Sequence, residues 1–185
     1  TATPSDLLPG ILKTARMGYD GKGQVRVTSA AELAAAWESV GRVPCVLEKM
    51  LPLALECSVI VARGHDGHVV NLPVQRNLHR DGILAVTEIY EENMPPALTS
   101  QAVEAAKSIA NELQYVGVLC VEFFVLQDGR LLANEMAPRP HNSAHYSIDA
   151  CDLSQFDLQV RTLVGAPLVA PRLHSAAVML NLLGD

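Results

Sequence analysis

Two glutamates on either side of a predicted tight turn are the side chains best suited to chemistry. Glu122 and Glu135 flank the stretch Gln127-Asp128-Gly129-Arg130, and Asp-Gly between two β-rich runs is a strong hairpin signal. Counting outward by equal steps from Asp128-Gly129 pairs Glu122 with Glu135. We therefore expect the two carboxylates to face each other across neighbouring antiparallel strands.

Facing carboxylates need a partner, because like charges directly opposite on two strands repel by up to about 1 kcal/mol when exposed and by more where water is scarce. A hard divalent cation would neutralise them, and Mg2+ held by two carboxylates completes its shell with waters and phosphate oxygens. Asn134 offers a further oxygen ligand or a phosphate donor. The other neighbours are apolar, which favours a shielded site: Val121, Phe123, Ala133 and Met136. The alternative is a solvated strand edge with two ordinary glutamates.

A glycine-rich loop between two predicted strands is a candidate phosphate site. Three glycines in six residues let backbone N–H groups approach an anion closely, although the spacing is that of neither a P-loop nor a dinucleotide fingerprint. Lys13, in an otherwise apolar strand before the loop, could reach a phosphate as a point charge. The alternative is a tight hairpin beside a solvated lysine. The loop consists of Gly18, Tyr19, Asp20, Gly21, Lys22, Gly23 and Gln24.

A stretch at an expected seam between two lobes could bind a small molecule. Glu48, Lys49, Met50 and Leu51 lead toward Glu56 at an expected seam between two lobes, where concave sites tend to form. Glu56 could accept two hydroxyls, such as those of a ribose. The alternative is a charged strand end.

A proline-stiffened loop directly follows the second carboxylate strand. Within it Arg139 could clamp a small carboxylate or carbonate, and His141 could move a proton. The alternative is a surface loop with a hydrogen-bonded histidine.

The elements that must position these residues follow from apolar periodicity and turn signals. Residues 77–82 are expected to form a loop. Helices are predicted over 29–40, with Ser29 and Glu32 as a capping box, and over 99–115. A third helix, from Ser154, is expected to turn Phe156, Val160 and Leu163 inward and to end at Gly165. Strands are predicted over 10–15, 24–28, 45–50, 55–63, 69–74, 117–126, 131–136 and 176–182.

Composition narrows the class of protein. In 185 residues, 49% hydrophobic and 18% charged residues indicate one folded domain or two small lobes. A net charge of -6 without a cluster of Lys and Arg argues against a nucleic-acid partner. Four dispersed cysteines without a C-x-x-C pair favour a reducing compartment, and the absence of a long apolar run or a signal peptide favours a cytoplasmic protein without membrane contact.

Taken together, several segments resemble the ATP-grasp superfamily of ligases. The resemblance covers about residues 10–185 and implies an α+β fold, in which two lobes with antiparallel sheets clasp a nucleotide. Residues 1–46 would form the small lobe and 47–185 the large lobe, with the flanking domains of family members expected to be absent. The segments are Lys13, G-Y-D-G-K-G-Q, E-K-x-L-x-x-x-x-E, N-L-H-R-D-G-I-L, V-E-F-F and N-E-M-A-P-R-P-H-N-S.

The resemblance implies ATP and Mg2+ as cofactors. Lys13 and the glycine loop would bind the phosphates, residues 48–51 would surround the adenine, and Glu56 would hold the ribose hydroxyls. His79 and Asn134 would be further nucleotide contacts, and Glu122 and Glu135 would bind Mg2+.

The matching branch of the superfamily carboxylates an amine at the expense of ATP. In it, bicarbonate becomes carboxyphosphate, and the exocyclic amine of aminoimidazole ribonucleotide is then carboxylated for purine biosynthesis, with release of ADP. Arg139 and His141 would serve bicarbonate and the proton, and Tyr19, Asp20 and Asn142 would lie nearer the ribonucleotide. A homodimer is expected.

Three alternatives remain at this point. The chain could be another ATP-grasp carboxylate-amine ligase with a different amine substrate, or a nucleotide-binding module without catalysis. It could also be a hydrolase that uses its two carboxylates without a metal.

Overall fold

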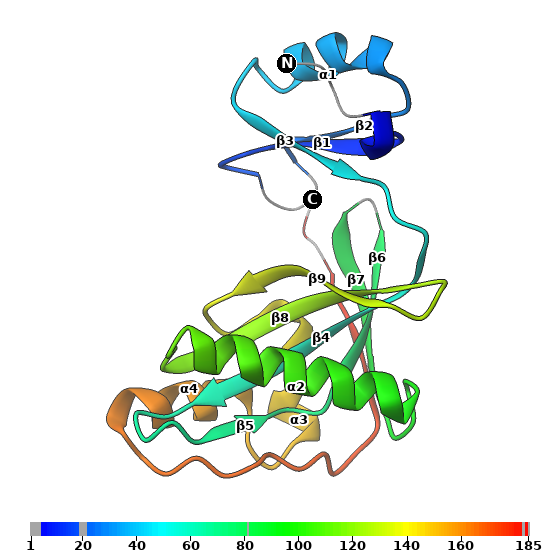
Figure 1. Ribbon diagram of the computed structural model, residues 1–185. Coiled ribbons are helices and arrows are strands. Elements are labelled where there is room, and N and C mark those ends of the chain that lie inside the picture. The colour runs from blue at the N-terminus through cyan, green and yellow to red at the C-terminus, as the bar shows by residue number, and fades with distance from the viewer. Residues whose placement is uncertain (1–4, 19–21, 81, 183, 185) are drawn as a thin grey trace. The chain divides into compact units, whose positions relative to one another are not determined.

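The computed structural model describes residues 5–18, 22–80, 82–182 and 184, and the chain divides into two compact units (Figure 1). The first unit comprises Thr1–Pro52 and Asp81–Ile83, and the second comprises Leu53–Arg80 and Leu84–Asp185. The division expected after residue 46 would have cut through a strand that pairs along its whole length inside the first unit.

The first unit is built on a three-stranded antiparallel sheet in the order β2-β1-β3. These strands are β1 (Gly10–Thr14), β2 (Gln24–Val27) and β3 (Cys45–Lys49), as predicted to within one residue at each end. The helix α1 (Leu33–Ser39) packs on the sheet and forms a small core with it through Leu12, Val27 and Ala36. A short 3-10 helix η1 (Ser5–Leu7) precedes β1.

The predicted capping box at Ser29 is wrong in its geometry. The helix begins with a 3-10 turn, η2 (Ala30–Glu32), and the Ser29 side chain accepts no cap hydrogen bond. Instead the Ser29 hydroxyl donates to the Glu32 carboxylate at 2.9 Å, which also accepts the Thr28 backbone N–H at 3.0 Å. The Ser29 hydroxyl thus donates to the Glu32 carboxylate instead of accepting a backbone N–H. The carboxylate accepts the backbone N–H of Thr28 rather than that of Ser29, the partner predicted for a capping box.

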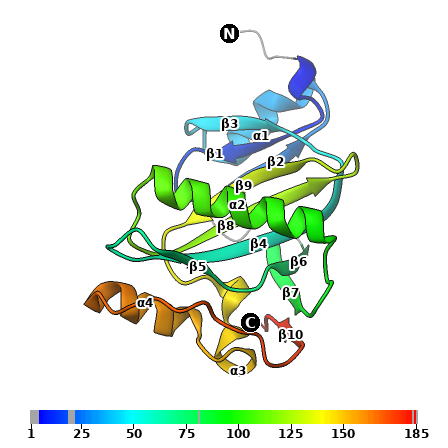
Figure 2. The ribbon, with the colours of Figure 1, turned by 60° about the horizontal axis from the view of Figure 1, so that its bottom comes forward.

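The second unit contains a seven-stranded sheet in the order β10-β7-β6-β4-β8-β9, with β5 paired to β4. One face is covered by α2 (Pro96–Glu112), and the other by α3 (Ser147–Ala150) and α4 (Gln155–Val164) (Figures 1 and 2). The short 3-10 helix η3 (Asn142–Ala144) contributes Ala144 to the core on the side of α3 and α4. The strands are β4 (Leu53–Arg63), β5 (Val69–Asn71), β6 (Gln75–Arg80), β7 (Ile83–Ile89), β8 (Gly117–Leu126), β9 (Leu131–Ala137) and β10 (Ala177–Leu180).

The two central strands, β4 and β8, carry the core. Because both faces of the sheet are covered, these strands are apolar almost without alternation, and successive residues enter different cores. Val59 and Val121 pack toward α2 with three alanines of that helix, whereas Ile60 and Cys120 pack toward α3 and α4. Among the described residues, none of the helices has the length and apolar character needed to span a bilayer.

The loop predicted over residues 77–82 is wrong, because β6 extends to Arg80 and occupies most of this range. The inward residues of β6 are Gln75, Asn77 and His79, which are polar yet largely buried. A strand whose buried side is polar lacks the apolar alternation by which strands are recognised.

The inward face predicted for α4 is also wrong. Its capping box of Ser154 and Asp157 is confirmed. However, Phe156, Val160 and Leu163 are exposed, while the buried positions are Gln155, Leu158 and Thr162. The Gln155 side chain accepts the backbone N–H of His141 and donates to its carbonyl, at 2.8 and 2.9 Å, and this polar contact holds that face of the helix inward.

Candidate functional site

The predicted carboxylate pair is confirmed: Glu122 on β8 and Glu135 on β9 are direct partners in the sheet. Glu122 is only 8% exposed, whereas Glu135 is exposed. The two carboxylates therefore lie on the same face of the sheet, with one in a buried environment and the other open to solvent.

The pairing arises differently from the prediction. The turn is a three-residue loop, closed by the Leu126 N–H donating to the Arg130 carbonyl at 2.9 Å. Next to this loop, each residue of β8 lies opposite a β9 residue one position earlier in the sequence than predicted, as in Phe123 opposite Ala133. The register then shifts at Asn134, the extra residue of a β-bulge, and this shift brings the two glutamates opposite each other.

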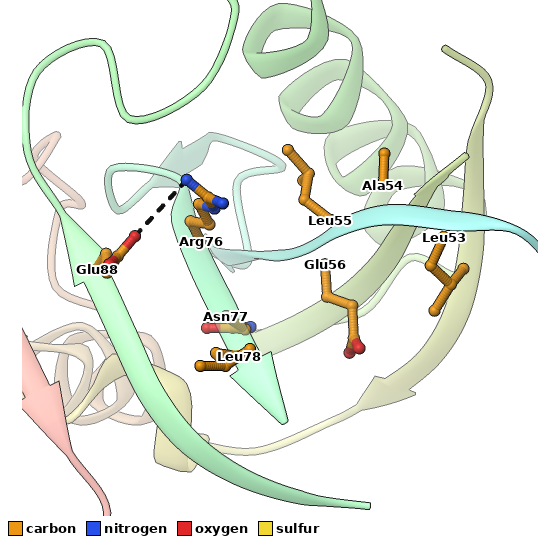
Figure 3. A pocket seen from close by; sticks show the side chains of 8 residues that line it. All are labelled: Leu53, Ala54, Leu55, Glu56, Arg76, Asn77, Leu78 and Glu88. Carbon is orange, nitrogen blue, oxygen red and sulfur yellow. Dashed lines mark ion pairs between the residues drawn. The ribbon is translucent and has the colours of Figure 1, made fainter. Parts of the chain in front are cut away.

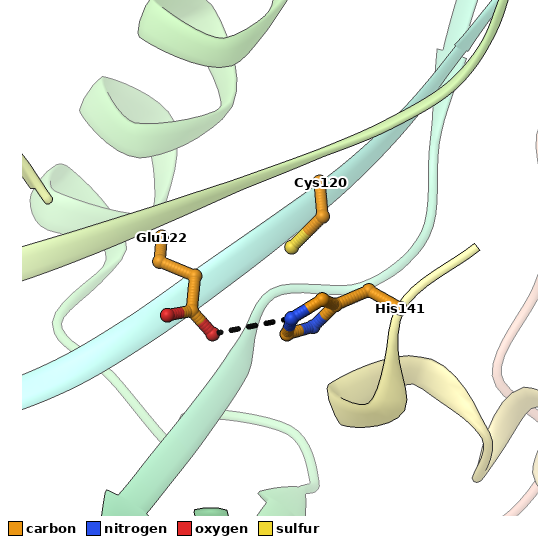
Figure 4. A group of neighbouring side chains, drawn as sticks. All are labelled: Cys120, Glu122 and His141. Atoms are coloured by element: carbon orange, nitrogen blue, oxygen red, sulfur yellow. Dashed lines mark ion pairs between the residues drawn. The ribbon is translucent and has the colours of Figure 1, made fainter. Parts of the chain in front are cut away.

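Glu122 lies beside a thiol and an imidazole (Figure 4). Its Oε1 atom is buried without a hydrogen-bond partner, and the nearest cationic candidate, Nε2 of His141, is 3.8 Å away. Burial raises the pKa of Glu122 to about 7, and the negative charges of Glu135 and Glu56 add to this effect. Oε1 of Glu122 thus has no hydrogen-bond partner, and the charge of His79 offsets the effect of burial only in part.

His141 is neutral in this setting. Burial lowers the pKa of His141 to about 4, and the positive charge of Arg139 contributes. Arg139 itself is exposed, and its guanidinium donates to the Pro140 carbonyl at 2.9 Å. Asn142 begins η3 and is half-buried. The loop therefore places an imidazole near Glu122 and an exposed guanidinium at the surface.

Glu56 and His79, assigned separate roles in the sequence, form a pair in the structure. Nδ1 of His79 lies 2.6 Å from Oε2 of Glu56, and both side chains are largely buried. The hydrogen bond to Glu56 raises the pKa of His79. The negative charges of Glu122 and Glu135 also raise the pKa of His79. Glu56, His79, Glu122 and Glu135 therefore belong to one electrostatic cluster.

A pocket opens where β4 and β6 part, and Glu56 points into it (Figure 3). The two strands pair only from Glu56 to Ser58, so the preceding residues of β4 separate from β6. The lining combines a carboxylate, an amide and an ion pair with apolar walls, a composition suited to a polar ring system or a sugar. It consists of Leu53, Ala54, Leu55, Glu56, Arg76, Asn77, Leu78 and Glu88.

Sequence reasoning missed a set of buried polar groups behind the carboxylates. Ser58, Asn77, Thr87 and Ser143 are each at most 5% exposed and are hydrogen-bonded to one another. Ser58 stands out in the sequence as the one hydroxyl in the apolar run of residues 57–62. That signal could have been used, whereas the partners from other strands could not be found without the register.

In the first unit, Lys13 and Glu48 form an ion pair, with Nζ 2.6 Å from Oε2. Gln24, at the start of β2, is the direct sheet partner of Lys13, so the end of the glycine loop lies beside the lysine. Gly18 and Lys22 are exposed at the described ends of the loop. The assignments to Tyr19, Asp20 and Gly21 lie outside the described residues.

Gly23 is required by the local backbone. It has a φ of 74°, and a Cβ atom there would lie 2.6 Å from Oγ1 of Thr14. Lys49 pairs with Gly10, while the Met50 N–H donates to the Pro9 carbonyl at 2.9 Å. Residues 48–51 thus run from β3 into the connection toward β4, and Leu51 is half-buried there.

Comparison with known proteins agrees with this geometry. A family model described as the ATP-grasp domain matches residues 6–156. The chain belongs to the ATP-grasp family. Within this family, the N5-carboxyaminoimidazole ribonucleotide synthase of Brucella melitensis is 47% identical over 182 residues, covering 95% of this chain and 49% of the relative. The protein of the same name from Bacillus subtilis is 41% identical over 178 residues, covering 96% and 47%.

Solved structures of ATP-grasp proteins support the same conclusion. The N5-carboxyaminoimidazole synthetase of Staphylococcus aureus complexed with ADP has a TM-score of 0.88 at 40% identity, covering 95% of this chain and 47% of that one. The Aspergillus clavatus enzyme, in complex with ADP and 5-aminoimidazole ribonucleotide, has a TM-score of 0.85 at 32% identity, covering 96% and 46%. The predicted fold is confirmed, and the chain spans about half the length of the curated relatives it matches.

Proposed function

We propose that this ATP-grasp chain takes part in the ATP- and bicarbonate-dependent carboxylation of 5-aminoimidazole ribonucleotide. The observation that carries the proposal is the Glu122–Glu135 pair, whose buried member has an unpartnered oxygen. The relatives described above support the choice of substrates. The curated relatives are named N5-carboxyaminoimidazole ribonucleotide synthase, and one solved structure is a complex with ADP and 5-aminoimidazole ribonucleotide.

The residues fit a bound Mg2+ ion. Glu122 Oε1 is a buried carboxylate oxygen without a hydrogen-bond partner, and burial raises the pKa of Glu122, with a smaller contribution from the negative charges of Glu135 and Glu56. Oxygen ligands suit a hard cation. Glu122 and Glu135 would hold the ion, with Asn134 adjoining, and the ion would supply neutralisation of phosphate charge.

The nucleotide contacts are assigned residue by residue. Lys13 and the glycine loop would take the phosphates, and residues 48–51 would line the adenine. Glu56, poised at the pocket of Figure 3, would accept the ribose hydroxyls, and His79 would fix the orientation of the Glu56 carboxylate through their 2.6 Å contact.

The reaction needs positioning and charge neutralisation rather than a protein nucleophile. A bicarbonate oxygen attacks the γ-phosphorus of ATP, the bond to the β-phosphate oxygen breaks, and ADP leaves. The substrate amine then attacks the carboxyl carbon, phosphate leaves and the nitrogen loses a proton. Arg139 and His141 would hold the bicarbonate, with Tyr19, Asp20 and Asn142 toward the ribonucleotide.

The decisive experiment measures ADP release by the intact protein with bicarbonate, in the presence and absence of aminoimidazole ribonucleotide. The proposal expects stimulation by this amine and formation of the carboxylated product. Stimulation by a different amine would indicate another ligase of the family, and ATP binding without turnover would indicate a binding module.

Two further parts of the proposal concern the whole protein. The family resemblance leads us to expect a homodimer, and the four dispersed cysteines lead us to expect a cytoplasmic location. Light scattering after size-exclusion chromatography tests the first point, and fractionation of the source cells tests the second.

A further inference from the structure

A series of buried hydroxyl and amide groups crosses three strands of the second unit and ends on the ring of His141. Thr87 on β7 donates to Oδ1 of Asn77 on β6 at 3.1 Å, and Nδ2 of Asn77 donates to Oγ of Ser58 on β4 at 2.8 Å. Ser58 Oγ donates to Ser143 Oγ at 2.9 Å, and Ser143 Oγ lies 2.9 Å from Nδ1 of His141.

The direction of these bonds is consistent along the series. Since Ser58 accepts from the Asn77 amide and donates to Ser143, the proton of the Ser143 hydroxyl can point to Nδ1 of His141. An independent contact agrees, because the backbone N–H of Ser143 donates to the same Nδ1 atom at 3.3 Å. Nδ1 is therefore an acceptor and carries no proton.

We propose that this relay fixes His141 in the tautomer with its proton on Nε2, so that the ring is a hydrogen-bond donor to anionic oxygen beside Glu122. Nε2 lies 3.8 Å from Glu122 Oε1, which has no hydrogen-bond partner. A lone pair in this position would repel the carboxylate, whereas an N–H attracts it and any anion bound next to it. The inference deepens the proposed function, in which that anion is bicarbonate.

The same tautomer would oppose coordination of a transition metal by His141 in the neighbouring cluster of side chains. Ligand-type atoms of Cys120, Glu122 and His141 lie within 4.8 Å of one another (Figure 4). Coordination by His141 would need a lone pair on Nε2, and the relay places a proton there. Thr87, Asn77, Ser58 and Ser143 are thus positioning residues, which act only through His141.

The test is the tautomer of His141, read from ring N–H correlations by NMR in the intact protein with 15N-labelled histidine. The signals are assigned by their loss in His141→Gln. The wild-type protein is expected to show the proton on Nε2, and Ser143→Ala, which keeps only the 3.3 Å backbone contact to Nδ1, to show a mixture of both tautomers. Asn77→Asp is expected to shift the proton toward Nδ1, since a carboxylate accepts the Ser58 proton and reverses the relay. Thr162→Val, which removes a buried hydroxyl in α4, is the control and should leave the signal unchanged.

Two results overturn the relay: a wild-type proton on Nδ1, or a tautomer that is unchanged in both folded variants. If Asn77→Asp does not fold, Ser58→Ala replaces it, and Ser143→Thr, which keeps a hydroxyl, should retain the wild-type signal. In turnover, Ser143→Ala is expected to lower kcat by about tenfold with little change in KM for ATP, as supporting residues of a site commonly do. A changed tautomer with full carboxylation supports the relay and contradicts the role of His141 in the proposed function.

Discussion

Glu122 and Glu135 face each other because Asn134 bulges out of β9. In an uninterrupted ladder from the turn, Asn134 would lie opposite Glu122, and Glu135 would point to the other face of the sheet, toward α2. The bulge thus brings a second carboxylate beside a buried one. Such repulsion costs stability in the free protein, and a bound cation removes it.

Glu135→Gln is therefore expected to affect the free and the nucleotide-bound protein in opposite directions. Without metal, loss of the repulsion should raise the unfolding free energy by up to about 1 kcal/mol. With ADP and Mg2+, the Mg2+-dependent part of the stabilisation should disappear. Calorimetric melting with and without ligand measures both, and Glu112→Gln on α2 is an exposed control. Full Mg2+-dependent stabilisation in Glu135→Gln contradicts the metal role.

The raised pKa of Glu122 predicts a pH dependence of stability. The folded protein holds this proton up to a pH of about 7, whereas an unfolded glutamate releases it near 4.5, so folding takes up a proton between these values. The contribution of Glu122 to stability is therefore greatest below pH 4.5 and is lost as pH rises through about 7. Glu122→Gln, which mimics the protonated form, should match the wild type near pH 4.5 and exceed it increasingly up to pH 7. Urea unfolding of both proteins across this range measures the difference, and a constant difference contradicts the shift.

The sequence sufficed for the hairpin and the facing glutamates but not for their surroundings. Asp128-Gly129 marked the turn, and the predicted pairing was right only because a three-residue loop and a one-residue bulge compensate each other. Neither feature has a sequence signal as strong as the turn. The Asp-Gly turn thus predicted the facing glutamates, whereas the loop length and the bulge that set the register could not be predicted from the sequence.

Lys13 is predicted to matter for nucleotide binding far more than for stability. Its ion pair with Glu48 is partly exposed, and such pairs contribute at most about 1 kcal/mol. Lys13→Met should therefore change the unfolding free energy by less than this amount. It should weaken ATP binding by about tenfold or more, which corresponds to about 1.4 kcal/mol. Titration calorimetry measures the affinity, and Lys107→Met on α2 serves as the control. Unchanged ATP affinity in Lys13→Met would remove the lysine from the phosphate site.

Gly23 and Gly41 provide a matched test of the glycine loop. Both have positive φ, 74° and 83°, but a Cβ atom would meet Thr14 at Gly23 and open space at Gly41. Gly41→Ala should cost about 1–2 kcal/mol for the left-handed backbone alone, and Gly23→Ala should cost more. Adding Thr14→Ala to Gly23→Ala should recover the excess. Equal losses at the two glycines in urea unfolding would show that the contact with Thr14 is unimportant.

The polar interior of the second unit explains most of what the sequence could not predict. Asn77 and His79 looked like loop residues because their partners, Ser58 and Glu56, lie on a different strand. Buried polar groups need partners, and a single sequence does not reveal which distant group supplies them. The same holds for Gln155, whose contacts with His141 decide which face of α4 is buried.

The orientation of α4 can be tested with one substitution at two positions. Leu158 is fully buried in the core against β8, whereas Leu163, predicted to face inward, is 71% exposed. Removing a buried leucine side chain leaves a cavity and typically costs 2–5 kcal/mol, so Leu158→Ala should lose about 3 kcal/mol of unfolding free energy. Leu163→Ala should change it by about 0.5 kcal/mol or less, since alanine is also the better helix former. Chemical denaturation of both variants measures these values. A larger loss at Leu163 would restore the face predicted from the apolar residues of the helix, and would place the Gln155 contact with His141 in doubt.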